Sequence, residues 1–331
     1  MVRVVVPRRR AVAVMGGALA APFVASGVAR AVDDWPNKPV RYINLFPAGG
    51  ATDVLSRVVC QQLSELTGQQ FVVENKGGSG GNVGADAIAK STPDGYTVGL
   101  MSIASHAISP TLYSKLPFDP EKDFTPISML WQVPNIFVVR PDIPVKSVPE
   151  LVALVKANPG KYTFASGGSG TSPHICGEWL KQVAGLNMVH VPYRGGAPAL
   201  QDLLAGQVDM EFDNIPGPLP QYKAGKLRGL AVTSPEPSPV APELPPMNSF
   251  YPGFEITSWG GMCGPAGLPA AMVEKASVLC KKALESEAVK AAFLAQGATP
   301  LWRNPAGAAE FRRNDEKKLA PIIVASGAKV N

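Results

Sequence analysis

The sequence predicts an α/β fold with two lobes that are joined by two crossing segments. Short apolar runs alternate with runs of helical spacing along most of the 331 residues, which is typical of parallel strands wound with helices. Two further stretches, residues 124–139 and 256–263, are apolar and extended. The first is too long for one ordinary strand, so we expect both to cross between the lobes and to form a hinge.

The two crossings divide the chain. We expect residues 32–133 and 259–331 to form one lobe, and residues 134–258 to form the other. Open α/β sheets bind ligands beyond the carboxyl ends of their strands. The two sheets are therefore predicted to face each other across one cleft.

The first lobe is predicted to begin with an apolar strand that ends at Pro47, followed by a tight loop at Gly49-Gly50. Residues 52–66 form a helix, because their apolar side chains recur at helical spacing, and Gly68 ends it. The next predicted elements are strand 71–75, loop 77–81, helix 82–90 and strand 96–101.

The second lobe repeats this alternation after the first crossing. Its first helix carries Pro149 near its start, where proline is well tolerated. The predicted elements are helix 148–156, strand 162–165, helix 173–184, strand 188–192, helix 197–204, and strands 208–212 and 227–233. A proline-rich surface loop covers residues 235–246, and helices at 270–296 and 306–319 complete the chain.

Four loops share a feature that points to anion binding. Each follows a strand, contains glycine and opens a helix. The N–H groups of such a loop and the positive end of the helix dipole suit a carboxylate or a phosphate. The four loops are residues 48–53, 77–82, 166–171 and 194–196.

Residues 1–31 have the pattern of an export signal that is cleaved off. Arg8-Arg9-Arg10 precede a weakly apolar run, which ends in the small residues Ala29-Arg30-Ala31. A membrane anchor is the alternative, but it needs about 20 strongly apolar residues, and glycine, serine and proline interrupt this run. The export route, Sec or twin-arginine, stays open.

The formal net charge of +5 comes from that segment. All five of its charged residues are arginines, and without them 26 basic residues balance 26 acidic ones. A basic surface for nucleic acid therefore has no support, and we expect no nucleic-acid partner.

The four cysteines are Cys60, Cys176, Cys263 and Cys280. An oxidising compartment permits disulfides, yet no pair shows the C-x-x-C spacing. Disulfides and buried free thiols both remain open from the sequence.

Enzymatic alternatives rest on the loop around Ser79. Residues 77–81 match the G-x-S-x-G pattern of hydrolases, and Gly78, Gly80 and Gly84 resemble part of a dinucleotide fingerprint. The acidic residue that this fingerprint needs is missing. An exported α/β hydrolase or a cofactor-dependent enzyme that uses the Ser79 loop is therefore the alternative function.

We expect no catalytic residue, no cofactor and no metal. His174 and Cys176 are two residues apart without a third ligand nearby, so core packing is the better interpretation. Asp53 has two interpretations: it stabilises the dipole of its helix, or it points into the cleft. Arg194 is either a carboxylate clamp or a solvated loop residue.

The motifs jointly resemble one known family, the extracytoplasmic solute receptors of tripartite tricarboxylate transporters, often called Bug receptors. They cover nearly all of residues 35–270 in order. The matching pieces are Phe46-Pro-Ala-Gly-Gly-Ala-Thr-Asp53, Val73-Glu-Asn-Lys-Gly-Gly-Ser-Gly-Gly-Asn82, Pro93-Asp-Gly-Tyr-Thr97, Leu116-Pro-Phe-Asp119, Gly168-Ser-Gly-Thr171 with His174, Val191-Pro-Tyr-Arg-Gly195, Ala224 to Ser234, and Ser258-Trp259.

The resemblance implies a monomeric, periplasmic binding protein of the two-lobe, type II-like kind. Such a protein closes on a small carboxylate and delivers it to the permease subunits of a membrane transporter. Family contacts come largely from backbone N–H groups, hydroxyls and ordered waters. Carried over to this sequence, the contact residues are Ala48, Gly49, Gly50, Asp53, Gly78, Ser79, Ser102, Ser169, Gly170, Thr171, His174 and Asp213.

Overall fold

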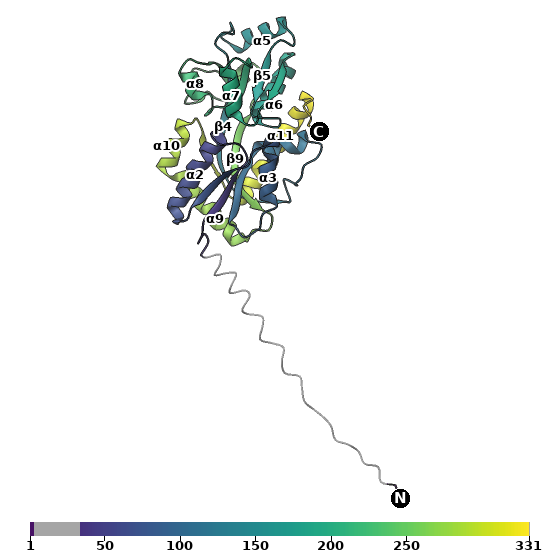
Figure 1. The fold of residues 1–331 in the computed structure, drawn as a ribbon, viewed down its shortest axis with the longest axis vertical. Coiled ribbons are helices and arrows are strands. Elements are labelled where there is room, and N and C mark those ends of the chain that lie inside the picture. The colour runs from purple at the N-terminus through teal and green to yellow at the C-terminus, as the bar shows by residue number, and fades with distance from the viewer. Residues whose placement is uncertain (3–33, 331) are drawn as a thin grey trace. The chain divides into compact units, whose positions relative to one another are not determined.

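This computed structural model describes residues 1–2 and 34–330. The chain divides into residues 1–35 and a second, compact unit, residues 36–331, which contains every helix and strand of the described residues (Figure 1). Apart from its first two residues, the predicted export signal lies outside the described residues. Within the described part, no helix is long and apolar enough to cross a membrane.

A ten-stranded sheet runs through the second unit in the order β2-β1-β3-β9-β4-β7-β5-β6, and β8 and β10 also pair with β4. The pairs of β1 with β2 and β3 are parallel, as are the pairs of β5 with β6 and β7. The strands are β1 (Val40–Asn44), β2 (Phe71–Asn75), β3 (Thr97–Ser102), β4 (Phe124–Val139), β5 (Thr163–Ser166), β6 (Val189–Pro192), β7 (Met210–Asn214), β8 (Arg228–Val232), β9 (Thr257–Pro265) and β10 (Thr299–Arg303).

β4 is the strand that joins the two halves of the sheet. Its residues 124–134 pair antiparallel with β9, whereas residues 135–139 pair with β7 and β8. The two predicted crossings are thus neighbouring antiparallel strands, and the predicted two-lobe α/β fold is confirmed. The assignment of individual residues to the lobes stays a prediction.

Helices cover both faces of the first half of the sheet. α2 packs against α9 and α10, while α3 lies on the other side of the strands (Figure 1). The helices are α2 (Ala51–Thr67), α3 (Asn82–Ala89), α4 (Ser109–Leu112), α5 (Val148–Ala157), α6 (Ser172–Ala184), α7 (Gly196–Leu204), α8 (Leu219–Lys223), α9 (Ala270–Glu285), α10 (Glu287–Ala295) and α11 (Pro305–Ser326), with short η1 (Ser79–Gly81), η2 (Ala104–Ile108) and η3 (Met247–Ser249).

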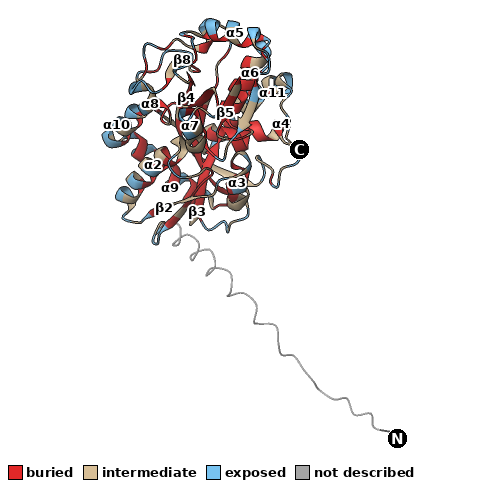
Figure 2. Ribbon diagram, turned by 45° about the horizontal axis from the view of Figure 1, so that its top comes forward, coloured by how far each residue is buried: buried red, intermediate tan, exposed pale blue. Residues whose placement is uncertain are grey.

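The core follows the strands and the inward faces of the helices (Figure 2). β4 is buried along most of its length, because both sides of this strand are covered. Trp131 on β4 packs edge-on against Phe293 of α10 at 6.3 Å between ring centroids. The strand that connects the lobes is therefore also one of the best packed.

Three predictions near the C-terminus need correction. The helix predicted over residues 270–296 is two helices, because Ser286 adopts extended backbone and caps α10 by accepting from the Val289 N–H. The helix predicted to end at Leu319 continues through Pro321 to Ser326. β10 was not predicted, since its five residues contain a proline and lack alternation.

All four cysteines are buried free thiols, which decides between the two alternatives left open by the sequence. They lie in the core of the fold, and desolvation raises the pKa of every one, that of Cys280 to about 12. Only the thiolate attacks a disulfide reagent.

We therefore expect the folded protein to be inert to a chromogenic disulfide reagent at pH 8. All four thiols should react once the chain is unfolded in guanidinium without reductant. If only two thiols per chain react under those conditions, or none, disulfides have formed, and this result would contradict the structure.

Candidate functional site

A cavity of about 300 Å³ lies between the two halves of the sheet. Of the predicted contact residues, the structure brings together at this cavity Ala48, Gly49, Gly50, Ser102, Thr171 and Asp213. The loop after β1 supplies the first three, and Ser102 is the last residue of β3. Thr171 lies at the start of α6 and Asp213 near the end of β7. Three of the four predicted glycine loops, residues 48–53, 166–171 and 194–196, therefore contribute to one cavity, and the loop at residues 77–82 does not.

Three helices begin at the wall of this cavity. The N-cap residues of α2, α6 and α7 are Gly50, Thr171 and Gly195. In each case the N-cap and the first two residues of the helix line the cavity. Early N–H groups of a helix have no partner within it, and the dipole adds partial positive charge at that end. The cavity is thus built to receive negative charge.

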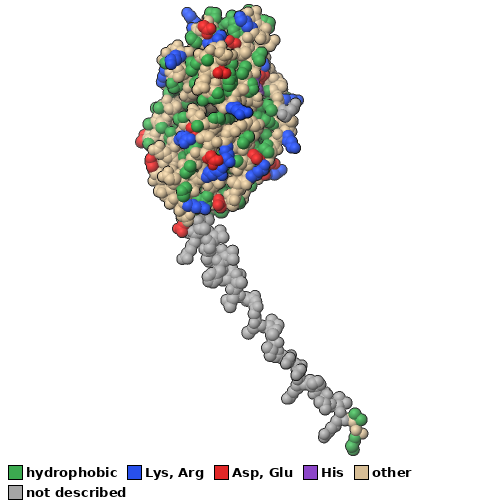
Figure 3. All heavy atoms as spheres, viewed as in Figure 1, with side chains coloured by type: hydrophobic (Ala, Val, Ile, Leu, Met, Phe, Trp, Pro, Cys, Tyr) green, Lys and Arg blue, Asp and Glu red, His purple; other side chains and the backbone are tan. Residues whose placement is uncertain are grey.

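The lining contains no cationic side chain. Among the described residues that line the cavity, Asp213 has the only ionisable side chain. Basic and acidic side chains are instead interspersed on the outer surface, as the face in Figure 3 shows. An anion in the cavity would be held by backbone dipoles and hydroxyls, without a counter-ion.

Polar side chains form a network at the floor of the cavity, where β4 and β9 meet the second lobe. The Asn214 side-chain amide donates to the Ser258 hydroxyl at 2.7 Å and to the side-chain Oδ1 of Asn135 at 2.8 Å. The Ser172 hydroxyl bonds both Asn135 and Ser258. Sequence reasoning missed this network, although Asn135 is conspicuous as a polar residue within an apolar run.

Apolar side chains complete the cavity wall. Trp259 is held in place because its indole N–H donates to Asp315 at 2.7 Å and its ring meets Phe311 edge-on. The other large apolar residues at the lining are Phe46, Leu55, Ile103, Trp131, Val133 and Leu200. A ligand with charged ends and an apolar body matches this combination.

Asp53 does not line the cavity. Its carboxylate accepts from the Gly49 N–H at 3.0 Å, from Arg57 and from Asn75. Burial alone would raise the pKa of Asp53, but the hydrogen bonds from these three groups outweigh it and lower the pKa. Asp53 therefore shapes the loop before α2, and the Gly49 N–H is already occupied.

The predicted contacts Gly78, Ser79 and Ser169 line a second cavity of about 320 Å³ instead. Here the lobes touch: the Tyr113 hydroxyl donates to the Ser169 carbonyl at 3.1 Å and lies 3.5 Å from the Ser79 hydroxyl. No histidine or carboxylate bonds to Ser79 among the described residues. The arrangement needed for a nucleophilic serine is absent from this part of the chain.

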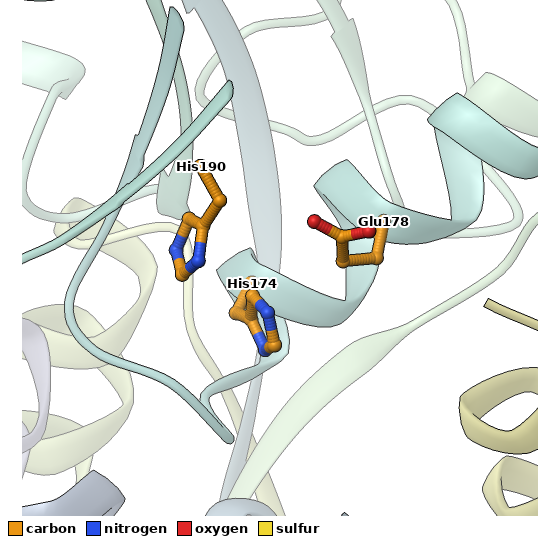
Figure 4. Close-up of side chains that lie close together, drawn as sticks. All are labelled: His174, Glu178 and His190. Atoms are coloured by element: carbon orange, nitrogen blue, oxygen red, sulfur yellow. The ribbon is translucent and has the colours of Figure 1, made fainter. Parts of the chain in front are cut away.

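Gly170 and His174 line neither cavity. The Gly170 N–H donates to His174 Nδ1 at 3.2 Å. Figure 4 shows His174 near Glu178 and His190, a set with potential metal-binding atoms within 4.8 Å of one another. Burial lowers the pKa of His174 to about 4, with a smaller effect of the nearby Lys181 charge.

The bonds within this cluster favour a structural role. Lys181 already neutralises Glu178 with two hydrogen bonds of 2.9 Å. A neutral His174 that accepts at Nδ1 carries its proton on Nε2, so that neither nitrogen offers a free lone pair. His190 stacks on His174 and bonds the Ser166 hydroxyl at 2.7 Å. Together these residues tie α6 to the edge strand β6.

Comparison with known proteins agrees with this geometry. The family model of the tripartite tricarboxylate transporter family receptor matches residues 55–328. The chain belongs to this family. It is a family of solute-binding receptors, not of enzymes. The alternative of a hydrolase or a cofactor-dependent enzyme is therefore set aside.

Relatives of known sequence or structure cover nearly the whole chain. BugT of Bordetella pertussis is 35% identical over 323 residues, 97% of this chain and 98% of its own. A Rhodopseudomonas palustris protein solved with adipate has a TM-score of 0.87 at 32% identity, over 90% of this chain and 100% of that one. MatC from Rhodopseudomonas palustris with bound malate has a TM-score of 0.83 at 28% identity, over 87% and 100%.

The structural role of Asp53 has a testable consequence. Because the folded-state pKa of Asp53 lies below its ordinary value, its stabilisation is present above about pH 4 and is lost as the pH falls through the folded pKa. Asp53→Asn should lower the free energy of unfolding at pH 7 by roughly 1–3 kcal/mol. The difference from wild type should shrink below pH 4, as measured by denaturant unfolding without ligand.

Glu285→Gln is the matched control, because Glu285 forms only an exposed pair with Lys281 at 3.8 Å. That change should stay within about 0.5 kcal/mol at both pH values. Equal effects of the two substitutions would show that Asp53 has no structural role.

Proposed function

We propose that the protein is a periplasmic receptor that captures a small carboxylate with an apolar body in the cavity between its lobes. The convergence of the α2, α6 and α7 N-termini on a cavity without cationic side chains carries this proposal. Relatives solved with adipate and malate support it, because both ligands are small carboxylates.

The proposed binding residues are the six predicted contacts at the cavity together with the polar network below it. The lobes are residues 32–133 with 259–331, and residues 134–258, as the two crossings suggest. Contacts from both lobes favour the closed arrangement, since only that arrangement makes every hydrogen bond. The ligand-loaded protein, a monomer, then docks on the permease subunits of a tripartite tricarboxylate-type transporter.

Export precedes these steps in the proposal. The signal at residues 1–31 directs the chain out of the cytoplasm and is removed near Val32. N-terminal analysis of protein recovered from the periplasm checks this point. Recovery of the intact chain from the cytoplasm alone would contradict it.

A thermal-shift screen tests ligand capture directly. Succinate, glutarate and adipate are compared with their uncharged diamides, which have nearly the same shape. A carboxylate present at about 100 times its Kd should stabilise the fold by roughly 2.7 kcal/mol, a shift of several degrees in Tm. If no carboxylate shifts the Tm, or if the diamides act equally, anion capture is refuted.

Tyr113→Phe tests closure of the lobes. The change removes the hydroxyl that reaches from the first lobe to the Ser169 carbonyl. A hydrogen bond contributes about 1 kcal/mol, so the Kd for the best carboxylate should rise about fivefold. Calorimetry measures this change in the Kd.

Tyr96→Phe provides the matched control. The Tyr96 hydroxyl donates to Asn37 at 2.8 Å, far from the cavity lining. Its loss should leave the Kd unchanged. Equal Kd values for wild type and Tyr113→Phe would show that the contact between the lobes does not contribute to capture.

A further inference from the structure

An acid in a cavity for anions needs a physical explanation, and Asp213 presents this problem. Its side chain lies at the lining and is 8% exposed. Oδ1 accepts from the Asn214 N–H at 2.8 Å. Oδ2 receives no hydrogen bond from the described residues. This second oxygen lies beside Gly196 and Gly217, two residues of the cavity lining, where an added Cβ would lie 2.6 Å and 2.8 Å from it.

A second acid stands two residues earlier on the same strand. Glu211 is fully buried, and neither of its carboxyl oxygens has a partner among the described residues. Residues i and i+2 of a strand point to the same face, so both carboxyl groups share one side of β7. No lysine or arginine of the described chain pairs with either of them.

The surrounding elements supply no compensating positive charge. β5 and residues 135–139 of β4 carry no ionisable side chain. On α7, Asp202 accepts a hydrogen bond from the Tyr193 hydroxyl. Burial raises the pKa of Tyr193, and the negative charges of Asp202 and Glu211 raise it further. α6 contributes His174, Cys176 and the paired Glu178–Lys181.

Burial raises the pKa of Asp213 to about 7. Burial and the nearby Asp213 raise that of Glu211 as well.

We propose that Asp213 binds the ligand as a neutral acid, with its Oδ2–H donating a hydrogen bond to a carboxylate oxygen of the ligand. Capture of the anion by a deprotonated receptor then takes up one proton from solvent, which stays on Oδ2. This inference rests on the proposed function, because it needs a carboxylate in the cavity. It makes the receptor sensitive to pH as well as to ligand.

Two physical arguments support the neutral form. An ionised Asp213 beside a ligand carboxylate would repel it in a cavity without a counter-ion. A proton on Oδ2 removes this repulsion and replaces it with an O–H···O⁻ bond, which is about twice as strong as a neutral one. The Asn214 N–H keeps Oδ1 as the acceptor, so the proton belongs on the oxygen that faces the ligand.

The affinity should therefore depend on pH with a definite sign. Below the raised pKa of Asp213, about 7 in the unliganded protein, the acid is already neutral and binding is strongest. Above it, the Kd should rise about tenfold per pH unit, because protonation must accompany binding. A ligand whose carboxylates are fully ionised throughout this pH range does not itself contribute to the pH dependence of the Kd.

Calorimetry counts the proton directly. The dicarboxylate with the largest Tm shift among succinate, glutarate and adipate is titrated into wild type at pH 8, in phosphate and in Tris, whose ionisation enthalpies differ. The observed enthalpies should indicate uptake of nearly one proton per ligand. Zero exchange would overturn the inference while leaving carboxylate capture intact, and release of a proton would point to an ionised Asp213 that accepts from a ligand donor. No binding by any of the three would refute the proposed function itself.

Two variants identify the group that takes up the proton. Asp213→Asn keeps the shape, and its amide N–H₂ takes the Oδ2 position because the Asn214 N–H holds the carbonyl oxygen. Its Kd should lose the pH dependence and lie below the wild-type Kd at pH 8.5. Glu211→Gln, outside the lining, should keep the uptake of a proton. If the Tm shows that Asp213→Asn is unstable, the comparison of wild type with Glu211→Gln still tests the assignment. Loss of proton uptake in Glu211→Gln would show that the proton does not reside on Asp213.

Discussion

An anion buried in a cavity without a cationic side chain has to be stabilised by hydrogen bonds and dipoles. This constraint accounts for the design of the site. Gly50, Thr171 and Gly195 each end a loop and start a helix whose first N–H groups have no partner within the helix. α2 belongs to one half of the sheet, and α6 and α7 belong to the other. Neither half alone surrounds a ligand, so capture and closure depend on the same contacts.

The crossing strands link this site to the connection between the lobes. Asn135 lies at the point where β4 changes partners from β9 to β7 and β8. Its side chain also joins Ser172 at the start of α6 to the network at the cavity floor. A change in the angle between the lobes would therefore disturb the groups that face the ligand. Residues of the crossing strands β4 and β9 thus also line the cavity.

Much of the fold could be predicted from the sequence, because Gly, Pro and periodic apolar residues act locally. Gly68 ends α2, as predicted, and the structure shows it in the left-handed conformation. Ser286 was missed as a break because serine occurs both inside helices and at their caps. The candidate site was harder to predict from the sequence than the fold. The glycine loops indicated where N–H groups converge, but not that Asp53 turns toward Gly49 and away from the cavity. Trp131, Ser172 and Asn214 meet only through tertiary packing, which no local pattern reports.

A ligand-bound crystal structure tests the central claim most directly. The carboxylate that stabilises the protein most should lie in the cavity, with its oxygens within hydrogen-bonding distance of first-turn N–H groups of α2 and of α6 or α7. No lysine or arginine side chain should contact it. A carboxylate paired with a cationic side chain, or one bound at the second cavity around Ser79, would contradict this account.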